Sequence, residues 1–219
     1  MTTFAELGVD QDIVDALAAK GIIDAFPIQE QTIPLGLPGQ DIIGQAKTGT
    51  GKTFGFGIPV VQRLGLDPAP GVKALIVVPT RELAVQVYED MDMLTSNRST
   101  SVVAIYGGKA YEGQIDQLKA GAQIVVGTPG RLIDLNNQRL LDLSHATEVV
   151  LDEADEMLDL GFLPDIEKIF TKVSQIRHTQ LFSATMPGPI VALARRFMSN
   201  PIHIRATDPD EGLTQANIK

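Results

Sequence analysis

A glycine-rich stretch between a short apolar run and a predicted helix constrains this chain more than any other feature. Its sequence, Ile-Ile-Gly-Gln-Ala-Lys-Thr-Gly-Thr-Gly-Lys-Thr, occupies residues 42–53. The apolar residues at its start predict a buried strand, and residues 52–64 predict a helix. Gly49 and Gly51 allow left-handed backbone conformations in the turn between them. The pattern is typical of a loop at a helix N-terminus, where unpaired N–H groups and the helix dipole attract phosphate.

The side chains of this loop point to a nucleotide bound with Mg²⁺. Lys52 would reach the β and γ phosphates, and the hydroxyl of Thr53 would bind the metal. A dinucleotide-binding turn is disfavoured, because Phe54 occupies the position of the third glycine. The full phosphate-loop pattern has Gly where this chain has Ala46, which opens the loop. The residues expected to bind nucleotide are Ala46, Lys47, Thr48, Gly49, Thr50, Gly51, Lys52 and Thr53.

Composition agrees with one large globular domain in the cytoplasm. The chain has 219 residues, 44% of them hydrophobic, and no cysteine, which excludes disulfides and thiolate metal sites. Its N-terminus does not have the pattern of a signal peptide, and no apolar run is long enough to span a bilayer. The net charge of −9 argues against a non-specific nucleic-acid coat. Much of the acidity lies in residues 1–30 and 208–211, however, so a local basic face is compatible with it.

Strand and helix patterns alternate along the chain. This alternation predicts an α/β fold, with a mostly parallel β-sheet covered by helices on both faces. One domain is expected over residues 1–206, and residues 207–219 are expected to form a tail or the start of a linker. Strands are predicted at 41–43, 74–78, 102–106, 123–127, 148–152, 179–183 and 202–205. Helices are predicted between a cap at Asp10 and a stop at Gly21, and at 28–36 (broken near Pro34), 52–64, 81–94, 111–120, 129–136, 164–172 and 188–198.

An acidic motif, Asp-Glu-Ala-Asp at residues 152–155, follows the predicted strand Glu-Val-Val-Leu. Ligands bind at the carboxyl ends of parallel strands, so these carboxylates are expected beside the phosphate loop. Asp152 would hold Mg²⁺, partly through water, and Glu153 would polarise the water that attacks the γ phosphate. The alternative to a catalytic role is that these acidic residues simply follow the strand in an ordinary loop.

These two motifs closely resemble those of the DEAD-box ATP-dependent RNA helicases of bacterial type. The resemblance covers residues 4–205 and extends to four further motifs in the family's order. It implies a RecA-like P-loop domain that binds ATP and Mg²⁺, hydrolyses ATP and binds RNA through its backbone without reading sequence. Lys52, Asp152 and Glu153 would be its catalytic residues. The four motifs are Pro79-Thr80-Arg81-Glu82-Leu83, Gly107-Gly108, Thr128-Pro129-Gly130-Arg131 and Ser183-Ala184-Thr185.

The resemblance also assigns residues that read adenine and bind RNA. In a region of about residues 2–30, the amide of Gln29 would read the adenine edge and Phe4 would stack on the base. Ile22 and Ala25-Phe26 depart from the family's pattern there, and without the family Gln29 would be read as a solvated helix-surface residue. The predicted RNA-binding residues are Pro79, Thr80, Arg81, Gly107, Gly108, Thr128, Pro129, Gly130 and Arg131, with Thr80 and Thr128 as helix N-caps. Asp155, Ser183 and Thr185 would couple the two sites.

The expected function is therefore that of the ATP-binding domain of an RNA helicase, which unwinds short duplexes when joined to a second RecA-like domain. That second domain carries a His-Arg-x-Gly-Arg motif in the family, and residues 1–219 contain none. The chain alone is expected to be monomeric and nearly inactive. Two alternatives belong to other classes: a non-catalytic, nucleotide-dependent RNA clamp or adaptor, and a small-molecule kinase, for which no lid segment is visible.

Overall fold

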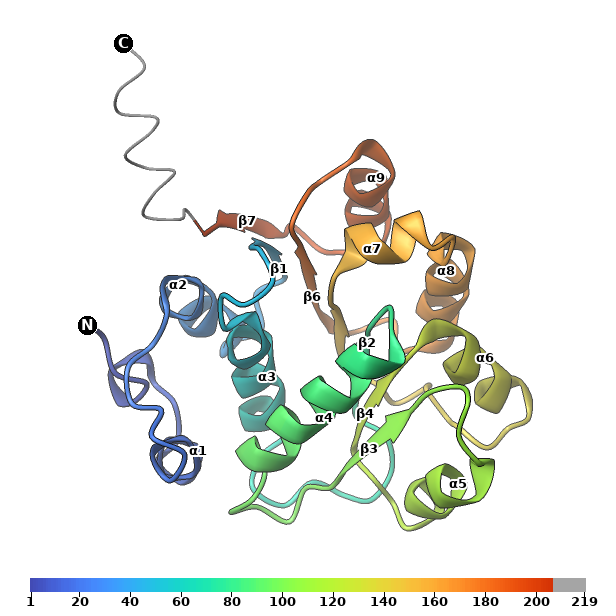
Figure 1. The fold of residues 1–219 in the computed structure, drawn as a ribbon, viewed down its shortest axis with the longest axis horizontal. Helices are drawn as coiled ribbons and strands as arrows, with labels where there is room; N and C mark the ends of the chain where they lie inside the picture. Colours follow the sequence, from blue (N-terminus) through green and yellow to red (C-terminus); the bar gives the residue numbers. More distant parts are fainter. Residues whose placement is uncertain (207–219) are drawn as a thin grey trace.

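A computed structural model describes residues 1–206, and the predicted tail at 207–219 lies outside them. Seven strands form one sheet in the order β3-β4-β2-β5-β6-β1-β7, and every pairing between them is parallel. Figure 1 shows this sheet running through the middle of the molecule. The strands are β1 (Ile42–Gln45), β2 (Ala74–Val77), β3 (Val102–Ile105), β4 (Ile124–Gly127), β5 (Glu148–Leu151), β6 (His178–Ser183) and β7 (Ile202–Arg205). The predicted parallel α/β fold is confirmed.

Helices follow the strands in the predicted alternation. Two short elements are absent from the sequence-based prediction: the 3₁₀ turn η1 and α7, which begins directly after Glu153. The prediction that Pro34 breaks the second helix is wrong, because the helix continues to Gly36. The helical elements are η1 (Ala5–Leu7), α1 (Gln11–Ala18), α2 (Pro27–Gly36), α3 (Lys52–Arg63), α4 (Arg81–Leu94), α5 (Tyr111–Lys119), α6 (Pro129–Asn137), α7 (Ala154–Asp159), α8 (Leu163–Lys172) and α9 (Gly188–Phe197).

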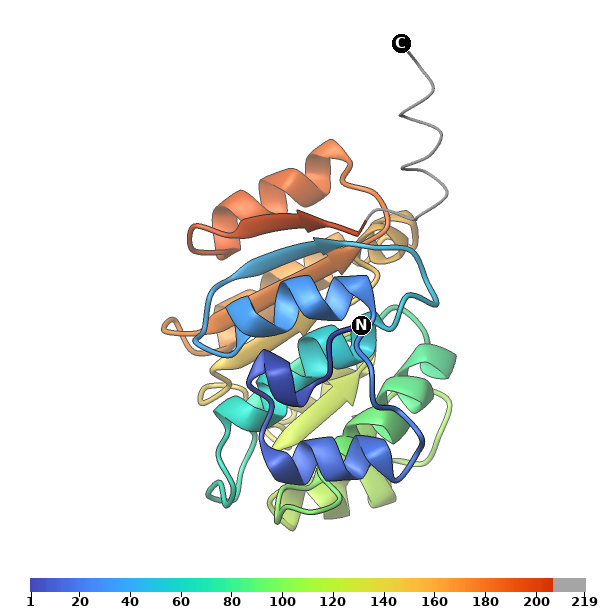
Figure 2. The same cartoon turned by 90° about the vertical axis from the view of Figure 1, so that its left-hand side faces the viewer.

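The inner strands β2 and β4 are apolar on both faces, and the sheet separates two hydrophobic clusters. In β2, Ala74 and Ile76 pack on one side, while Leu75 and Val77 pack on the other. This alternation follows from the two-residue period of a strand. Helices α1 to α4 cover the first face and α6 to α9 cover the second. Figure 2 shows α1 and α2 as the layer in front of the sheet.

A buried arginine fastens the N-terminal segment to the body of the domain. The side chain of Arg98 is fully buried, and it pairs with Asp12 at 2.6 Å and with Asp10 at 2.8 Å. It also donates to the carbonyl oxygen of Val61 at 3.2 Å, at the end of α3. Asp10 occupies the predicted N-cap position of α1, but its carboxylate makes no cap bond, because it accepts from Arg98 instead. Either bond would use the charged carboxylate, but the pair with Arg98 adds the attraction of a full opposite charge.

No helix among residues 1–206 combines the length and hydropathy needed to cross a membrane.

Candidate nucleotide and RNA site

The carboxyl ends of neighbouring strands carry the sequence motifs, and the strand order separates them into two groups. On β1, β6 and β5 lie the phosphate loop, Ser183 and the residues that begin at Asp152. On β2, β4 and β3 lie the segments that begin at Pro79, Thr128 and Gly107. Each group occupies three adjacent strands, and the groups meet between β5 and β2. Residues expected to bind nucleotide and residues expected to bind RNA therefore form two halves of one edge of the sheet.

The phosphate loop runs from β1 into α3 through two left-handed glycines. Gly49 has a φ of 87° and Gly51 a φ of 76°, and Gly51 occupies the N-cap position of α3. No side chain caps this helix, so no side-chain oxygen competes for its first N–H groups. The loop is braced internally, because the hydroxyl of Thr50 donates to the carbonyl oxygen of Lys47 at 2.8 Å. The geometry is that of a phosphate-binding helix N-terminus.

Lys52 and the acidic motif meet beside this loop. Lys52 Nζ lies 2.8 Å from Asp152 Oδ1 and 3.4 Å from Glu153 Oε1. The hydroxyl of Thr48 also donates to Glu153, at 3.2 Å. Glu153 has a φ of 54° and a ψ of 52°, a left-handed conformation that is uncommon for a residue with a side chain. Backbone strain of this kind concentrates at functional sites.

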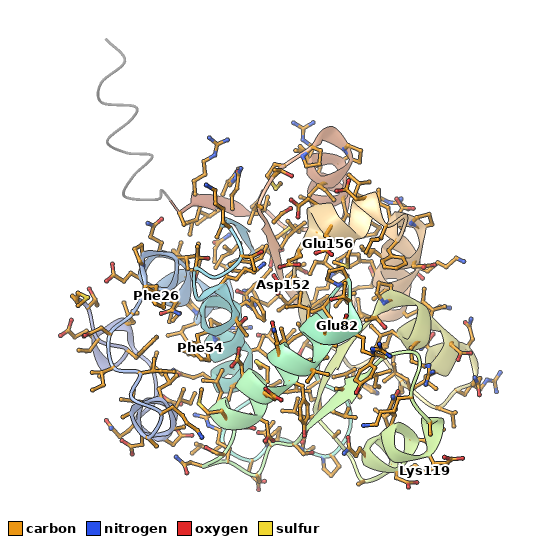
Figure 3. All side chains as sticks on the ribbon, viewed as in Figure 1. Phe26, Phe54, Glu82, Lys119, Asp152 and Glu156 are labelled. Carbon is orange, nitrogen blue, oxygen red and sulfur yellow. The ribbon has the colours of Figure 1, made fainter. Side chains whose placement is uncertain are left out.

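Burial and neighbouring charges set unequal proton affinities in this cluster. Complete burial raises the pKa of Asp152, although the Lys52 ammonium opposes this shift. Burial also acts to raise the pKa of Glu153, but its hydrogen bond with Glu156 and the charge of Lys52 outweigh burial and lower it. The same hydrogen bond, followed by burial, raises the pKa of Glu156 to about 7. Asp152 and Glu156 are both labelled near the centre of the view in Figure 3.

The residues present fit a metal held mainly by the nucleotide. Asp152 Oδ2 is buried and has no hydrogen-bond partner among the described residues, so a ligand could use it. Within residues 1–206, no group of three or more acidic or histidine side chains is arranged to hold a metal by itself. This is the donor set expected for Mg²⁺, which usually binds through one or two carboxylates together with phosphates.

The amide of Gln29 is occupied on both sides. Its Nε2 donates to the carbonyl oxygen of Gly51 at 2.7 Å, and its Oε1 accepts from the backbone of Phe26 at 2.8 Å. The side chain is 1% exposed, so the alternative of a solvated surface residue is wrong. An amide retains one further donor and one further lone pair after these two bonds. In this structure the amide holds the loop, and its contact with a base stays a prediction.

The exposed aromatic residue beside the loop is Phe26, not Phe4. The predicted stacking role of Phe4 needs an accessible ring, but Phe4 is 1% exposed and packs in the core. Phe26 is 57% exposed and touches the loop, because a Cβ on Gly51 would lie 2.5 Å from its ring. In Figure 3, Phe26 lies on the α2 side of Asp152. In the sequence, Ala25-Phe26 departs from the family's pattern, and this departure could have pointed to Phe26 as the aromatic residue beside the loop.

The residues predicted to bind RNA follow the neighbouring strands β2, β4 and β3. Thr80 caps α4, since its hydroxyl accepts from the backbone of Leu83 at 3.2 Å. Thr128 begins α6 but makes no side-chain cap bond, contrary to the prediction. Gly108 has a φ of 82° and lies against Arg81, where a Cβ would be 2.9 Å from Nη1. These segments of α4 and the β3 exit thus form one surface.

Asp155 and the β6 exit are joined by hydrogen bonds. The hydroxyl of Ser183 accepts from the backbone of Asp155 at 3.1 Å and donates to the carbonyl oxygen of Thr185 at 2.7 Å. The backbone and hydroxyl of Thr185 both donate to the Asp155 carboxylate, at 3.1 and 2.9 Å. The acidic motif on β5 is therefore fixed to the next strand of the sheet.

Comparison with known proteins gives a consistent result. The family described as DEAD/DEAH box helicase matches residues 26–193. The chain is 52% identical over 205 residues to the ATP-dependent RNA helicase CshA of Listeria monocytogenes, an alignment that covers 94% of this chain and 39% of that protein. It is 46% identical over 217 residues to the DEAD-box ATP-dependent RNA helicase CshA of Bacillus subtilis, covering 99% of this chain and 43% of that one.

A solved structure shares the fold. The crystal structure of a DEAD box protein from Methanococcus jannaschii superposes with a TM-score of 0.89 at 42% identity, covering 94% of this chain and 56% of the other. Such a match assigns the RecA-like fold. The chain spans 39% and 43% of the length of the two curated relatives above.

Proposed function

We propose, on the premise that this chain belongs to the DEAD/DEAH box helicase family, that it is the ATP-binding part of an ATP-dependent RNA helicase. Its substrates would be ATP with Mg²⁺ and an RNA strand held through its backbone. A second RecA-like domain of the same protein would complete the enzyme. A cytoplasmic location and a monomeric state belong to the same proposal.

The observation that carries the proposal is the contact between Lys52, Asp152 and Glu153 beside an uncapped helix N-terminus. A phosphate loop alone would support nucleotide binding only. A carboxylate held 3.4 Å from the loop lysine by a left-handed backbone adds a base beside the side chain that would reach the γ phosphate. This arrangement supports hydrolysis over a non-catalytic clamp.

Each residue of the cluster would have its own role in binding or hydrolysing ATP. Lys52 would exchange part of its pairing with the carboxylates for the β and γ phosphates. Glu153, whose pKa is lowered, would be ionised and would accept hydrogen bonds from the attacking water. Asp152 and Thr53 would hold Mg²⁺, which when bound lessens the charge on the phosphate oxygens. The first N–H groups of α3 would orient the phosphates.

On the other half of the sheet edge, backbone and cationic groups would hold RNA. The N-termini of α4 and α6 offer N–H groups, and Gly107 and Gly108 allow a strand to come close to the backbone. Arg81 is half exposed beside Gly108 and can pair with a phosphate. Ser183 and Thr185, bonded to Asp155, would transmit changes between the two halves.

Phosphate release from ATP by the whole protein, with and without single-stranded RNA, tests the proposal. We expect RNA to stimulate release, and a short RNA duplex to be separated only when ATP is present. Capture of RNA that needs ATP but occurs without phosphate release would favour the nucleotide-dependent clamp. A rate of phosphate release that RNA does not change, but that a small metabolite changes, would favour a kinase-like enzyme.

A further inference from the structure

A hollow of about 390 Å³ lies between α4, β3 and α5, at the outer edge of the sheet. It is separate from the phosphate loop, which lies on the other half of the sheet edge. The rings of Tyr88 and Tyr106 line it, together with Lys109 and Gln114. Figure 1 shows α4 and α5 on either side of β3, and Figure 3 labels Glu82 and Lys119 on these two helices.

The hollow continues from the proposed RNA surface. Arg81, Val85 and Tyr88 are spaced at i, i+4 and i+7 on α4, so they share one face of the helix. Arg81 touches Gly108 at one end of this face, and Val85 and Tyr88 line the hollow below it. A strand held at the Gly107-Gly108 turn would therefore pass the mouth of the hollow.

Gln114 supplies a polar group that the protein leaves unused. The residue is 5% exposed, and its Nε2 donates to the carbonyl oxygen of Tyr106 at 3.2 Å. Its Oε1 is buried and has no hydrogen-bond partner among the described residues. A buried acceptor without a donor is unfavourable and uncommon in folded proteins. The terminal amide torsion of glutamine is broad, so a small rotation would present this oxygen to a ligand in the hollow.

The lining has the chemistry of a nucleobase site. Aromatic rings offer stacking surfaces for any base, and an amide oxygen accepts from the ring or exocyclic N–H groups that bases carry. The phenol of Tyr88 can donate a hydrogen bond because a tyrosine is neutral near neutral pH, and burial, followed by the charge of Asp92, raises its pKa further. Lys109 at the rim is exposed and can pair with the phosphate of the same nucleotide.

We propose that this hollow binds one unstacked nucleobase of the RNA strand that runs past Gly107 and Gly108, with the base between Tyr88 and Tyr106 and its N–H group on Gln114. The inference rests on the proposed RNA binding and goes beyond it, because the other proposed RNA contacts are made to the backbone alone. The strand would be fixed at one nucleotide as well as along its phosphates.

The test compares two ligands of equal length and charge: a ten-nucleotide single-stranded RNA and the corresponding abasic chain. Their affinities for the whole protein are measured by fluorescence anisotropy in the presence of a non-hydrolysable ATP analogue. The variants are Tyr88→Leu, which removes a ring, and Gln114→Leu, which removes the acceptor at similar volume. Gln86→Leu, an exposed glutamine on α4 that does not line the hollow, is the matched control.

We expect the wild type and the control to prefer the RNA over the abasic chain. Tyr88→Leu should lose about tenfold of this preference, as base stacking predicts, and Gln114→Leu should lose about fivefold with its hydrogen bond. Affinity for the abasic chain should stay the same in all proteins. Thermal unfolding verifies that each variant is folded, and replacing an unpaired buried acceptor by leucine should not lower stability.

Two results would overturn the inference: a preference unchanged in both hollow variants, or an equal loss for both ligands, which would mean that the hollow acts on the backbone. Failure of the wild type to bind either ligand would instead refute the proposed RNA binding, so the two failures are distinguishable.

Discussion

Gln29 holds the phosphate loop in place: its Nε2 donates to the carbonyl oxygen of Gly51 over 2.7 Å. The contact requires a glycine, because a Cβ at position 51 would lie 2.6 Å from the same nitrogen. The residue proposed to read adenine is thus bonded to the N-cap residue of α3. Base recognition and loop geometry are therefore linked through one side chain.

The first prediction follows from this double role. Gln29→Ala removes the bond to Gly51 and the bond to the backbone of Phe26, so it should weaken ADP and GDP together by roughly 1 kcal/mol. It should also reduce the preference for ADP over GDP. Calorimetric titration of both nucleotides measures the two effects. An unchanged ratio would remove Gln29 as the adenine reader, and unchanged absolute affinities would show that the contact with Gly51 is unimportant.

The second prediction concerns the buried pair of Lys52 and Asp152. Lys52→Met leaves a fully buried carboxylate without its cation, which should cost about 3 kcal/mol or more of unfolding free energy at pH 8. Burial raises the pKa of Asp152, so this variant should lose stability as pH rises through that pKa and should suffer least at low pH. Urea unfolding at pH 5 and pH 8, without nucleotide, measures both.

The matched control for this pair is the double variant Lys52→Met with Asp152→Asn. It removes the charge as well as the cation, so most of the lost stability should return and the added pH dependence should disappear. A single variant as stable as the wild type at pH 8 would mean that the pair does not balance the buried charge.

The third prediction uses the proton shared by Glu153 and Glu156. The pKa of Glu156 is raised from 4.5 to about 7, so between these values the folded state holds a proton that the unfolded state has released. The unfolding free energy should therefore fall as pH rises from about 4.5 to 7. Glu156→Gln imitates the protonated form and should flatten that part of the curve.

Urea unfolding at closely spaced pH values provides the comparison. Glu167→Gln, a partly exposed carboxylate on α8, serves as the control and should keep the wild-type slope. If Glu156→Gln and the control lose stability in parallel over this window, Glu156 does not hold the extra proton.

Sequence reasoning reached the fold and the main site because both depend on local patterns. Alternating apolar runs fix the parallel sheet, and the loop at 42–53 and the motif at 152–155 each contain their chemistry in consecutive residues. Sequence reasoning failed where the partner of a side chain lies far away in the sequence. Phe4 is buried because it packs against the core. The carboxylate of Asp10 pairs with Arg98, which lies far along the chain. No local pattern identifies Gln114, because its unpaired oxygen arises from the packing of α5 on β3.

The last prediction tests the central claim, that this cluster hydrolyses ATP with Glu153 as the base. Glu153→Gln keeps the shape of the side chain and removes its charge, so ATP affinity should persist while turnover falls by on the order of 10²-fold or more. Glu167→Gln, a carboxylate remote from the loop, should leave turnover unchanged.

The decisive measurement is the rate of phosphate release from ATP at saturating RNA, in the whole protein, for the wild type and Glu153→Gln. We predict near-background release by the variant at an ATP concentration that calorimetry shows to be saturating for both proteins. Release by a folded, ATP-bound Glu153→Gln at close to the wild-type rate would contradict the assignment of this cluster as the hydrolytic centre.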